Sequence, residues 1–258
     1  MVADHSAVGP IALITGASSG IGLAYATHLA AQGHRLILVS QDPDRLAQAC
    51  QQLGDSVIAQ HALDLSEREG VNALIEAVPT PDVLIANAGV TLPGEVGSID
   101  RETRDRLYYL LCGGVIDLLE ALLPLMKARG QGRTVVISSI AALTPMRKSS
   151  LYASAKAAVA RYTDSLSVEL RSTPLKLTVS LPGYVRTAAH ERAGLGHLQK
   201  QIPNWMWLTA DEMVKETERA SLQGKASIVP GRVYRWVRPF LGSPLANAAW
   251  QQLSGRRR

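Results

Sequence analysis

The sequence predicts one α/β domain built on a doubly wound parallel sheet. The chain has 258 residues, of which 47% are hydrophobic and 19% are charged, and this length is sufficient for one large domain with its own core. Short apolar runs alternate with longer helical patterns from residue 11 to residue 181. Such alternation, with short connections, is typical of parallel strands covered by helices on both faces.

Composition and charge exclude several classes of function. The net charge is +5 and the pI is about 9.4, and part of that charge is the terminal run Arg256, Arg257 and Arg258. A run of this kind is more often a solvated terminus than a contact with nucleic acid or a membrane. The chain contains no base-reading motif, so we expect no nucleic-acid partner.

The cysteines and the N-terminal segment bear on the compartment. Cys50 and Cys112 lie in helical patterns and form no Cys-x-x-Cys or Cys/His cluster, so neither a disulfide framework nor a metal site is predicted. Residues 1–10 lack the basic and then apolar layout of a signal peptide. No run of about twenty apolar residues is found either. We therefore expect a cytoplasmic protein without a transmembrane segment.

A glycine-rich turn opens the predicted sheet. Residues 11–14 form an apolar strand, and Thr15 to Gly22 then carries the spacing Gly-x-x-x-Gly-x-Gly before a helical pattern over 23–32. Glycines let the backbone turn tightly and approach a pyrophosphate at the N-terminus of the helix. The spacing differs from the general Gly-x-Gly-x-x-Gly fingerprint, and an ordinary glycine-rich strand-to-helix turn is the alternative.

The residues that follow the second strand, predicted over 35–39, bear on the choice of cofactor. An acid at this place binds the 2′-hydroxyl of NAD, whereas an arginine nearby accommodates the 2′-phosphate of NADP. The chain has Ser40 and Gln41 instead. Neither side chain would repel a phosphate, and both, with Ser19, can hydrogen-bond one. NADP(H) is therefore favoured over NAD(H).

Acidic residues follow the second and the third predicted strands. The negative charges of Asp42 and Asp44 weigh against a bound 2′-phosphate. However, an aspartate before a proline, as at Asp42, is typical of a helix start, and a helix is predicted over 44–53. Asp64 follows a third strand over 56–61; it either contacts adenine or only completes the next turn, and both interpretations stay open. The run from Ser66 to Glu69 matches a capping box that opens another helix.

Three further strands are predicted over 82–86, 133–139 and 176–181. They complete a Rossmann-like, three-layer αβα arrangement, in which ligands bind beyond the carboxyl ends of the strands. Between the first two of these strands, a long helix over 104–127 contains Gly113 and Gly114. Adjacent glycines cost about 1 kcal/mol each in a helix interior, so they indicate close backbone packing or a local distortion.

Tyr152 and Lys156 lie four residues apart in a helical pattern that extends to about residue 171. This spacing places both side chains on one helix face. A free phenol titrates near pH 10, and a cation held beside it lowers that pKa. The pair is therefore a candidate general acid/base, although the same spacing also occurs on ordinary solvated helix faces.

The chain beyond residue 187 differs in character. All four tryptophans lie after residue 200, and residues 190–206 show little periodicity, which predicts a mobile lid. Thr209 to Glu212 matches a capping box, and a final strand is predicted over 226–230. Val233, Trp236, Val237, Phe240 and Leu241 fall at helical spacing. That stripe packs on the domain or on a second subunit, with a membrane-surface helix as the less favoured alternative.

Five short motifs follow one another between residues 11 and 187. They are Thr15-Gly16-x-x-x-Gly20-Ile21-Gly22, Asn87-Ala88-Gly89, Ser139, Tyr152-x-x-x-Lys156 and Pro182-Gly183-x-x-x-Thr187. In this order and spacing they resemble the classical short-chain dehydrogenases/reductases. The resemblance implies oligomers, either homodimers or homotetramers, and it implies a single domain. In that domain, residues 11–187 would form the cofactor-binding and catalytic core, 188–225 a substrate lid and helix, and 226–258 a final strand and amphipathic tail.

The resemblance also implies a role for each motif. Tyr152 would be the general acid/base, Lys156 would lower its pKa and bind the nicotinamide ribose, and Ser139 would hydrogen-bond the substrate oxygen. Together with the residues argued above, the expected cofactor-binding set is Gly16, Ser18, Ser19, Gly20, Ile21, Gly22, Ser40, Gln41, Asp64, Leu65, Asn87, Ala88, Gly89, Tyr152, Lys156, Pro182, Gly183, Val185 and Thr187.

One position departs from the family pattern. The family places an asparagine in the long helix, three residues before a glycine, and an alignment through Gly114 puts Leu111 there. The asparagine is held to anchor a water that relays protons to the lysine, and leucine has no polar atom to do so. Either the relay uses other groups, the enzyme is slow, or the alignment is displaced by a residue or two.

The function expected from the sequence is an NAD(P)-dependent oxidoreductase that acts on a small-molecule ketone, aldehyde or secondary alcohol. The alternative is a cofactor-binding regulator or scaffold with little turnover, for which Leu111 is the main argument. A sugar-nucleotide epimerase or dehydratase is disfavoured, because little chain follows Thr187 to form a larger substrate domain. Trp205, Met206, Trp207 and Leu208 suit an apolar substrate body or, equally, a subunit contact.

Overall fold

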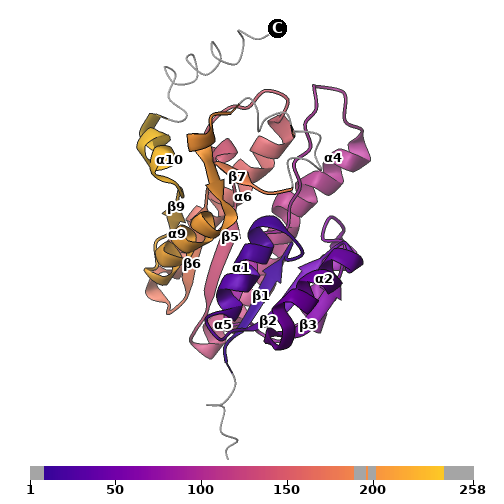
Figure 1. The fold of residues 1–258 in the computed structure, drawn as a ribbon, viewed down its shortest axis with the longest axis vertical. Coiled ribbons are helices and arrows are strands. Elements are labelled where there is room, and N and C mark those ends of the chain that lie inside the picture. The colour runs from indigo at the N-terminus through magenta and orange to yellow at the C-terminus, as the bar shows by residue number, and fades with distance from the viewer. Residues whose placement is uncertain (1–8, 189–195, 197–201, 241–258) are drawn as a thin grey trace, which may run out of the picture.

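Seven parallel strands form the central sheet of the computed structural model, which describes residues 9–188, 196 and 202–240 (Figure 1). Their order across the sheet is β3-β2-β1-β4-β5-β6-β9. The strands are β1 (Ile11–Thr15), β2 (Arg35–Ser40), β3 (Val57–Ala62), β4 (Val83–Ala86), β5 (Arg133–Ile137), β6 (Lys176–Ser180) and β9 (Ser227–Ile228). The predicted doubly wound parallel sheet is confirmed.

Burial explains why the strands read as continuous apolar runs. All four residues of β4 and all five residues of β5 are buried, since helices cover both faces of these central strands. The edge strand β3 instead alternates half-buried and exposed residues. The alternation in β3 is the pattern of a strand with one solvated face.

Helices cover the sheet in two layers. One face carries α1 (Gly20–Ala30), α2 (Pro43–Leu53) and α9 (Ala210–Leu222), and the other carries α3 (Arg68–Ala77), α4 (Arg101–Tyr108), α5 (Gly114–Arg129) and α6 (Ser150–Glu169). Neighbouring residues of one strand serve different layers: in β1, Leu13 packs toward α5 and α6, whereas Ile14 packs toward α1 and α9. These layers form the expected three-layer αβα sandwich.

Three helix starts were predicted from capping residues, and the structure agrees with two of them. Asp42 caps α2 with Pro43 in its first turn, and Thr209 caps α9 in a complete capping box with Glu212. The capping box predicted from Ser66 is wrong, because α3 begins one residue later, after Glu67. The hydroxyl of Ser66 instead donates to Asp64 Oδ1 at 2.6 Å, within the preceding turn.

The long helix contains the distortion that its glycine pair predicted. Between α4 and α5, residues Tyr109–Gly113 form a π-helical turn, and such turns occur often at functional sites. The continuous helical stretch Arg101–Arg129 is long and apolar enough to cross a membrane. Buried leucines of α5, among them Leu118 and Leu122, pack in the core against the sheet, and this packing accounts for its apolar character.

The C-terminal part of the described chain adds a small second sheet and a short helix. Strands β7 (Tyr184–Arg186) and β8 (Trp207–Thr209) pair in parallel, and α10 (Arg232–Val237) follows β9. Within this single chain the predicted stripe is mostly not packed on the domain, because Trp236 is 80% exposed and the buried residue of α10 is Tyr234; packing of the stripe on a second subunit stays a prediction. Most of the predicted lid, and the tail from residue 241, lie outside the described residues.

Candidate active site

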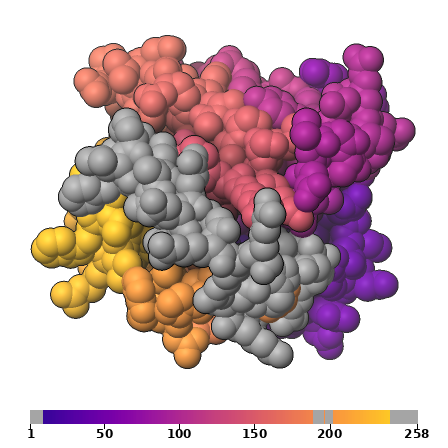
Figure 2. All heavy atoms as spheres, turned by 90° about the horizontal axis from the view of Figure 1, so that it is seen from above, coloured from indigo at the N-terminus to yellow at the C-terminus, as the bar shows by residue number. Residues whose placement is uncertain are grey.

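A cleft of about 1310 Å³ opens at the carboxyl ends of the strands. Residues that follow β1, β2, β3, β4, β5 and β6 line it. Figure 2 views the molecule from this end, where the segments that follow β4 (magenta) and β5 (salmon) lie beside each other. Of the predicted site residues, the cleft is lined by Gly16, Ser18, Ser19, Gly20, Ile21, Ser40, Gln41, Asp64, Leu65, Asn87, Ala88, Gly89, Ser139, Tyr152, Lys156, Pro182, Gly183, Val185 and Thr187.

The glycine-rich turn is fixed by close backbone approaches. Gly16 and Gly20 have φ angles of 66° and 56°, in the left-handed region where glycine is favoured. A Cβ on Gly22 would lie 2.1 Å from the carbonyl oxygen of Gly16, so Gly22 packs behind the turn and does not line the cleft. Asn87 ties the turn to β4, because its Nδ2 donates to the carbonyl oxygen of Thr15 at 2.9 Å.

The turn leaves the first residues of α1 facing the cleft, and this arrangement fits a dinucleotide. The first amide groups of any helix lack intrahelical acceptors and carry a partial positive charge. In α1 they belong to Gly20, Ile21 and Gly22, and the first two of these residues line the cleft. A Cβ on Gly20 would lie 3.1 Å from Thr187 Cγ2, so glycine lets Thr187 pack closely against the turn. The free amides at the start of α1 suit an anionic group.

Small polar groups and one arginine surround the far end of the cleft, beyond β2. Ser18 Oγ and Ser40 Oγ lie 2.7 Å apart, and Gln41 Nε2 donates to Asp64 Oδ2 at 2.8 Å. Arg45 also lines the cleft, paired with Asp42 at 2.7 Å. The sequence was not read as placing Arg45 in the cofactor site. Its position three residues after the helix cap Asp42, close behind the second strand, is a signal that could have indicated this place.

Asp64 fills one of the two roles that the sequence left open, and its contact with adenine stays a prediction. Its Oδ1 accepts from the backbone N of Ser66 at 2.9 Å and completes the turn, while the side chain also lines the cleft. Arg106 of α4 donates to Asp64 Oδ2 at 2.6 Å. Burial raises the pKa of Asp64, but the hydrogen bonds from Ser66 and the charge of Arg106 outweigh it, so the pKa lies below its ordinary value. Asp64 is therefore a carboxylate at neutral pH.

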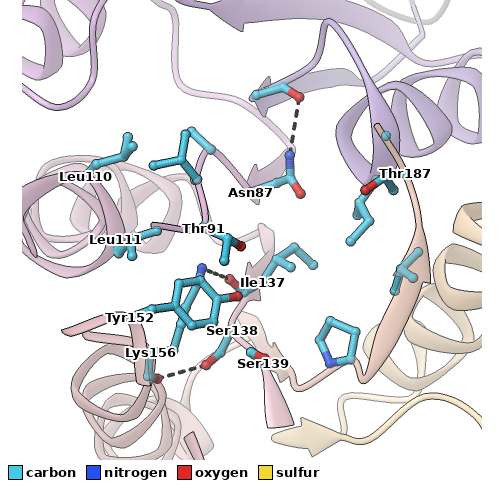
Figure 3. A pocket seen from close by; sticks show the side chains of 18 of the residues that line it. Asn87, Thr91, Leu110, Leu111, Ile137, Ser138, Ser139, Tyr152, Lys156 and Thr187 are labelled. Atoms are coloured by element: carbon cyan, nitrogen blue, oxygen red, sulfur yellow. Dashed lines mark hydrogen bonds between the residues drawn. The ribbon is translucent and has the colours of Figure 1, made fainter. Parts of the chain in front are cut away.

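Tyr152, Ser139 and a residue that the sequence did not indicate, Thr91, meet at the inner end of the cleft (Figure 3). Tyr152 projects from the first turn of α6, and Ser139 follows β5. Burial raises the pKa of Tyr152 above its ordinary value of 10.0, and hydrogen bonds with the hydroxyls of Ser139 and Thr91 act in the opposite direction. The backbone N of Ala141 donates to Ser139 Oγ at 3.1 Å, so the hydroxyl proton of Ser139 is available to another acceptor.

Lys156 lies on the same face of α6 as Tyr152, but its ammonium reaches the end of β5. Its Nζ donates to the carbonyl oxygen of Ile137 at 2.8 Å (Figure 3). Burial lowers the pKa of Lys156 from 10.5 to about 8. The sequence predicted that this ammonium would lower the pKa of Tyr152. In the structure burial has the larger effect on the phenol, and the groups that oppose it are hydroxyls.

Leu111 occupies the π-helical turn beside Lys156. It is 0% exposed and also borders the cleft. A Cβ on Gly89 would lie 3.0 Å from Leu111 Cδ2 and 3.7 Å from Lys156 Nζ, so the leucine and the ammonium approach the same point. The alignment that places Leu111 at this position agrees with the geometry, and an apolar side chain occupies the place.

The fold and the site together define a Rossmann-like protein with a dinucleotide-sized cleft and a tyrosine, serine and lysine at its inner end. The model of the family described as short chain dehydrogenase matches residues 10–196. The chain belongs to this family, which confirms the resemblance drawn from the five motifs.

Individual proteins agree with this assignment. An uncharacterised oxidoreductase of Staphylococcus saprophyticus is 33% identical over 200 residues, which are 75% of this chain and 86% of that protein. A short-chain dehydrogenase from Sphingobium yanoikuyae, solved with NADPH, is 29% identical, with a TM-score of 0.78 and 96% of each chain covered. A short-chain dehydrogenase/reductase from Burkholderia phymatum, solved with NAD, has a TM-score of 0.80 with 95% of each chain covered. Its identity is 23%, so it supports the fold alone.

Proposed function

We propose that the protein is an NAD(P)-dependent oxidoreductase that interconverts a carbonyl compound and a secondary alcohol. The observation that carries the proposal is the cluster of Ser139, Tyr152 and Lys156 at the inner end of a cleft whose other part is a glycine-rich turn. Hydride transfer belongs to the nicotinamide when it is bound. The chain supplies binding, orientation and the proton.

Each side chain has a distinct task in the proposed reduction. Tyr152 gives its hydroxyl proton to the substrate oxygen as that oxygen gains negative charge. Ser139 donates a hydrogen bond to the same oxygen, and two pre-placed hydroxyls stabilise the developing charge more than mobile water would. Lys156 contributes positive charge and orientation near the ribose from its anchor on Ile137. Oxidation of the alcohol runs the same steps in reverse.

NADP(H) is the proposed cofactor in preference to NAD(H). Ser18, Ser40 and Gln41 offer hydrogen bonds without negative charge, and Arg45 adds a cation in the same part of the cleft. In the structure this guanidinium is paired with the carboxylate of Asp42, which partly neutralises its charge. A 2′-phosphate would compete with Asp42 for the guanidinium, which binds phosphate oxygens in a bidentate fashion. The NADPH bound to the Sphingobium protein is consistent with this choice.

The proposed substrate is a carbonyl compound with an apolar body. The lining of the cleft includes the apolar side chains of Ile140, Met146, Ile202 and Met206 and the ring of Tyr184, and side chains of this kind favour an apolar ligand. The protein is further proposed to be a homodimer or homotetramer, as the family resemblance implies, and to be cytoplasmic, as expected from its sequence.

The first experiment is a fluorescence titration of the purified protein with NADPH and with NADH, followed by cofactor oxidation with a panel of ketones. Tyr152→Phe keeps the ring and removes the proton. We expect it to lower kcat by about 10²- to 10⁴-fold, the usual contribution of general acid/base catalysis, and to leave NADPH affinity nearly unchanged.

Two results would contradict the proposal. Substantial residual activity in Tyr152→Phe would remove this residue from the proposed role. Tight cofactor binding without turnover across a broad panel would favour the alternative of a cofactor-binding regulator. If NADH bound at least as tightly as NADPH, the proposed preference would be wrong while the reaction class would stand.

A further inference from the structure

Tyr234, the buried residue of α10, connects that helix to the wall of the cleft. Its side chain is 3% exposed. Its hydroxyl accepts from the backbone N of Tyr184 at 3.1 Å and donates to the carbonyl oxygen of Met206, and both of these partners line the cleft. We infer that Tyr234 is a positioning residue for substrate binding, which holds the two segments in the places from which they contact the substrate. This inference rests on the function proposed above.

The hydroxyl of Tyr234 bridges the small second sheet at the end where its two strands begin. Tyr184 is the first residue of β7, Met206 immediately precedes β8, and the strands pair through Tyr184 and Trp207. Burial raises the pKa of Tyr234 to about 12, so the phenol keeps its proton at neutral pH. It can therefore donate to one segment while it accepts from the other, and one side chain holds both segments.

The ring of Tyr234 supports the segment that leads into β7. A Cβ on Gly183 would lie 2.1 Å from Tyr234 Cζ, so the ring packs directly against the backbone of this glycine, which also lines the cleft. The ring belongs to a buried cluster with Leu181 and Val229. Packing of this kind requires only the ring. The hydroxyl adds hydrogen bonds to two backbone groups of the cleft wall, and these bonds are the basis for a role in positioning.

Helix α9, which lies below α10 in Figure 1, holds α10 where the contact of Tyr234 requires it. Gly231 immediately precedes α10 and has a φ angle of 91°, in the region where glycine is favoured. Its backbone N and the guanidinium of Arg235 both donate to Glu216 Oε2 of α9, each at 2.9 Å. Glu216 and Tyr234 therefore make separate contacts that hold the short helix against the domain.

The test compares the wild type with Tyr234→Phe, which keeps the ring on Gly183 and removes the hydroxyl. Tyr162→Phe is the matched control, because the Tyr162 hydroxyl donates to Glu120 and neither of these residues lines the cleft. Cofactor oxidation is measured with a bulky aromatic ketone and with a small aliphatic ketone. We expect Tyr234→Phe to raise the KM for the aromatic ketone by about five- to tenfold, because the wall loses the hydrogen bonds that hold it.

The comparison of the two ketones separates positioning from a general loss of stability. For the small ketone we expect KM to rise by less than about twofold, since a small body makes fewer contacts with the wall, and kcat should change by less than about twofold with either ketone. A purely structural role would not distinguish the two substrates. Tyr162→Phe should leave both KM values unchanged.

A second measurement does not depend on turnover. Hydrogen exchange at single backbone amides, followed by NMR, reports how firmly each segment is held. The amide of Tyr184 donates to Tyr234, whereas the amide of Met206 donates to Pro203 at 3.0 Å. We expect exchange at both amides to be about tenfold faster in Tyr234→Phe and unchanged in Tyr162→Phe. Faster exchange at Met206 would show that the segment itself is released, because this amide does not bind Tyr234.

The two measurements separate the inference from the proposed function. If the wild type turns over ketones and Tyr234→Phe leaves both KM values unchanged, or raises them by the same factor, the inference is overturned and the function stands. If no ketone is turned over but exchange accelerates at both amides, Tyr234 still holds the two segments of the wall and the proposed reaction fails. Unchanged exchange at Met206 would overturn the inference in either case.

Discussion

Leu111 places an apolar side chain in the candidate active site, beside Lys156. It sits at the inner wall of the cleft with no exposed surface, in the same core cluster as Leu107 and Leu118. A polar residue here would need hydrogen-bond partners, because an unpartnered buried amide costs about 1–3 kcal/mol. The described neighbours of Leu111 are mainly apolar, apart from the Lys156 ammonium near Gly89.

Leu111→Asn is therefore expected to lower the free energy of unfolding by about 3 kcal/mol, from the lost burial of leucine and the poorly paired amide. If the site lacks a proton relay, the folded variant should nevertheless keep or exceed the wild-type kcat. Urea denaturation and kcat measured on the same preparation test both statements. Leu110→Asn is the control, since Leu110 is only half-buried and should lose less stability. A Leu111→Asn variant as stable as the wild type would contradict this account.

The residues that were predictable from the sequence are those whose contacts follow from local spacing. Tyr152 and Lys156 are one helical turn apart, and Gly16 and Gly20 belong to one turn, so their proximity needed no tertiary information. Thr91 was not predictable, because the contact with Tyr152 joins loops about 60 residues apart in the chain and depends on how β4 and β5 pair. The direction of the shift in the pKa of Tyr152 was missed for a similar reason, since burial is a property of the assembled cleft.

At the scale of elements, α4 connects Asp64, at the outer end of the cleft, with the π-helical turn beside Lys156. Arg106 in α4 binds Asp64 and also pairs with Glu67, and the same helix continues into the π-helical turn that carries Leu111. Capping was less predictable than the helices themselves. Thr209 and Ser66 begin the same capping motif, but only Thr209 caps its helix, by accepting from the backbone N of Glu212, whereas α3 begins after Glu67.

Arg106→Gln is expected to weaken NADPH binding by about three- to tenfold, although Arg106 does not line the cleft. Without the arginine, Asp64 and Gln41 lose the partner that fixes the carboxylate, and a partly exposed pair of this kind contributes roughly 1 kcal/mol. Arg101→Gln is the control, because its pair with Asp105 is long, 3.8 Å, and both side chains are largely exposed. Fluorescence titration with NADPH measures both variants. Equal affinities would show that α4 does not act on the adenosine end of the cleft.

At the scale of the whole molecule, the order of the strands creates the cleft. Strand β1 lies between β2 and β4, so the connections after β1 and β4 depart in opposite directions and leave a crevice at the carboxyl edge. The sequence predicted this topology because the short connections and apolar runs permit few other arrangements. It did not predict that Tyr234 is the residue of α10 that packs on the domain, because helical spacing does not reveal which face finds a partner: Tyr234 is buried, with its hydroxyl hydrogen-bonded to the backbone of Met206.

The burial of Lys156 is expected to affect the stability of the whole domain as the pH changes. Its pKa is lowered to about 8 in the folded protein from an ordinary value of 10.5. Below pH 8 the buried ammonium is charged in both states, and its desolvation reduces the free energy of unfolding. Between the two pKa values the unfolded chain holds the proton that the folded protein has released, so this contribution makes stability rise with pH. The rise is on the order of 2–3 kcal/mol.

Several buried groups, Cys112 and Tyr152 among them, act in the opposite direction, so a variant is needed to isolate the lysine. Burial raises the pKa values of Cys112 and Tyr152 above 9.0 and 10.0, and each lowers stability as the pH rises past its ordinary value, because the unfolded chain then ionises first. Lys156→Met keeps both groups and removes the ammonium. The difference in unfolding free energy between wild type and Lys156→Met, measured by urea denaturation from pH 7 to 10, should shift in favour of the wild type as the pH rises above 8. Lys127→Met is the control, because it removes an exposed lysine of α5, and it should show no such trend. If the stability profiles of wild type and Lys156→Met run parallel over this pH range, the folded protein does not disfavour the charged form of Lys156.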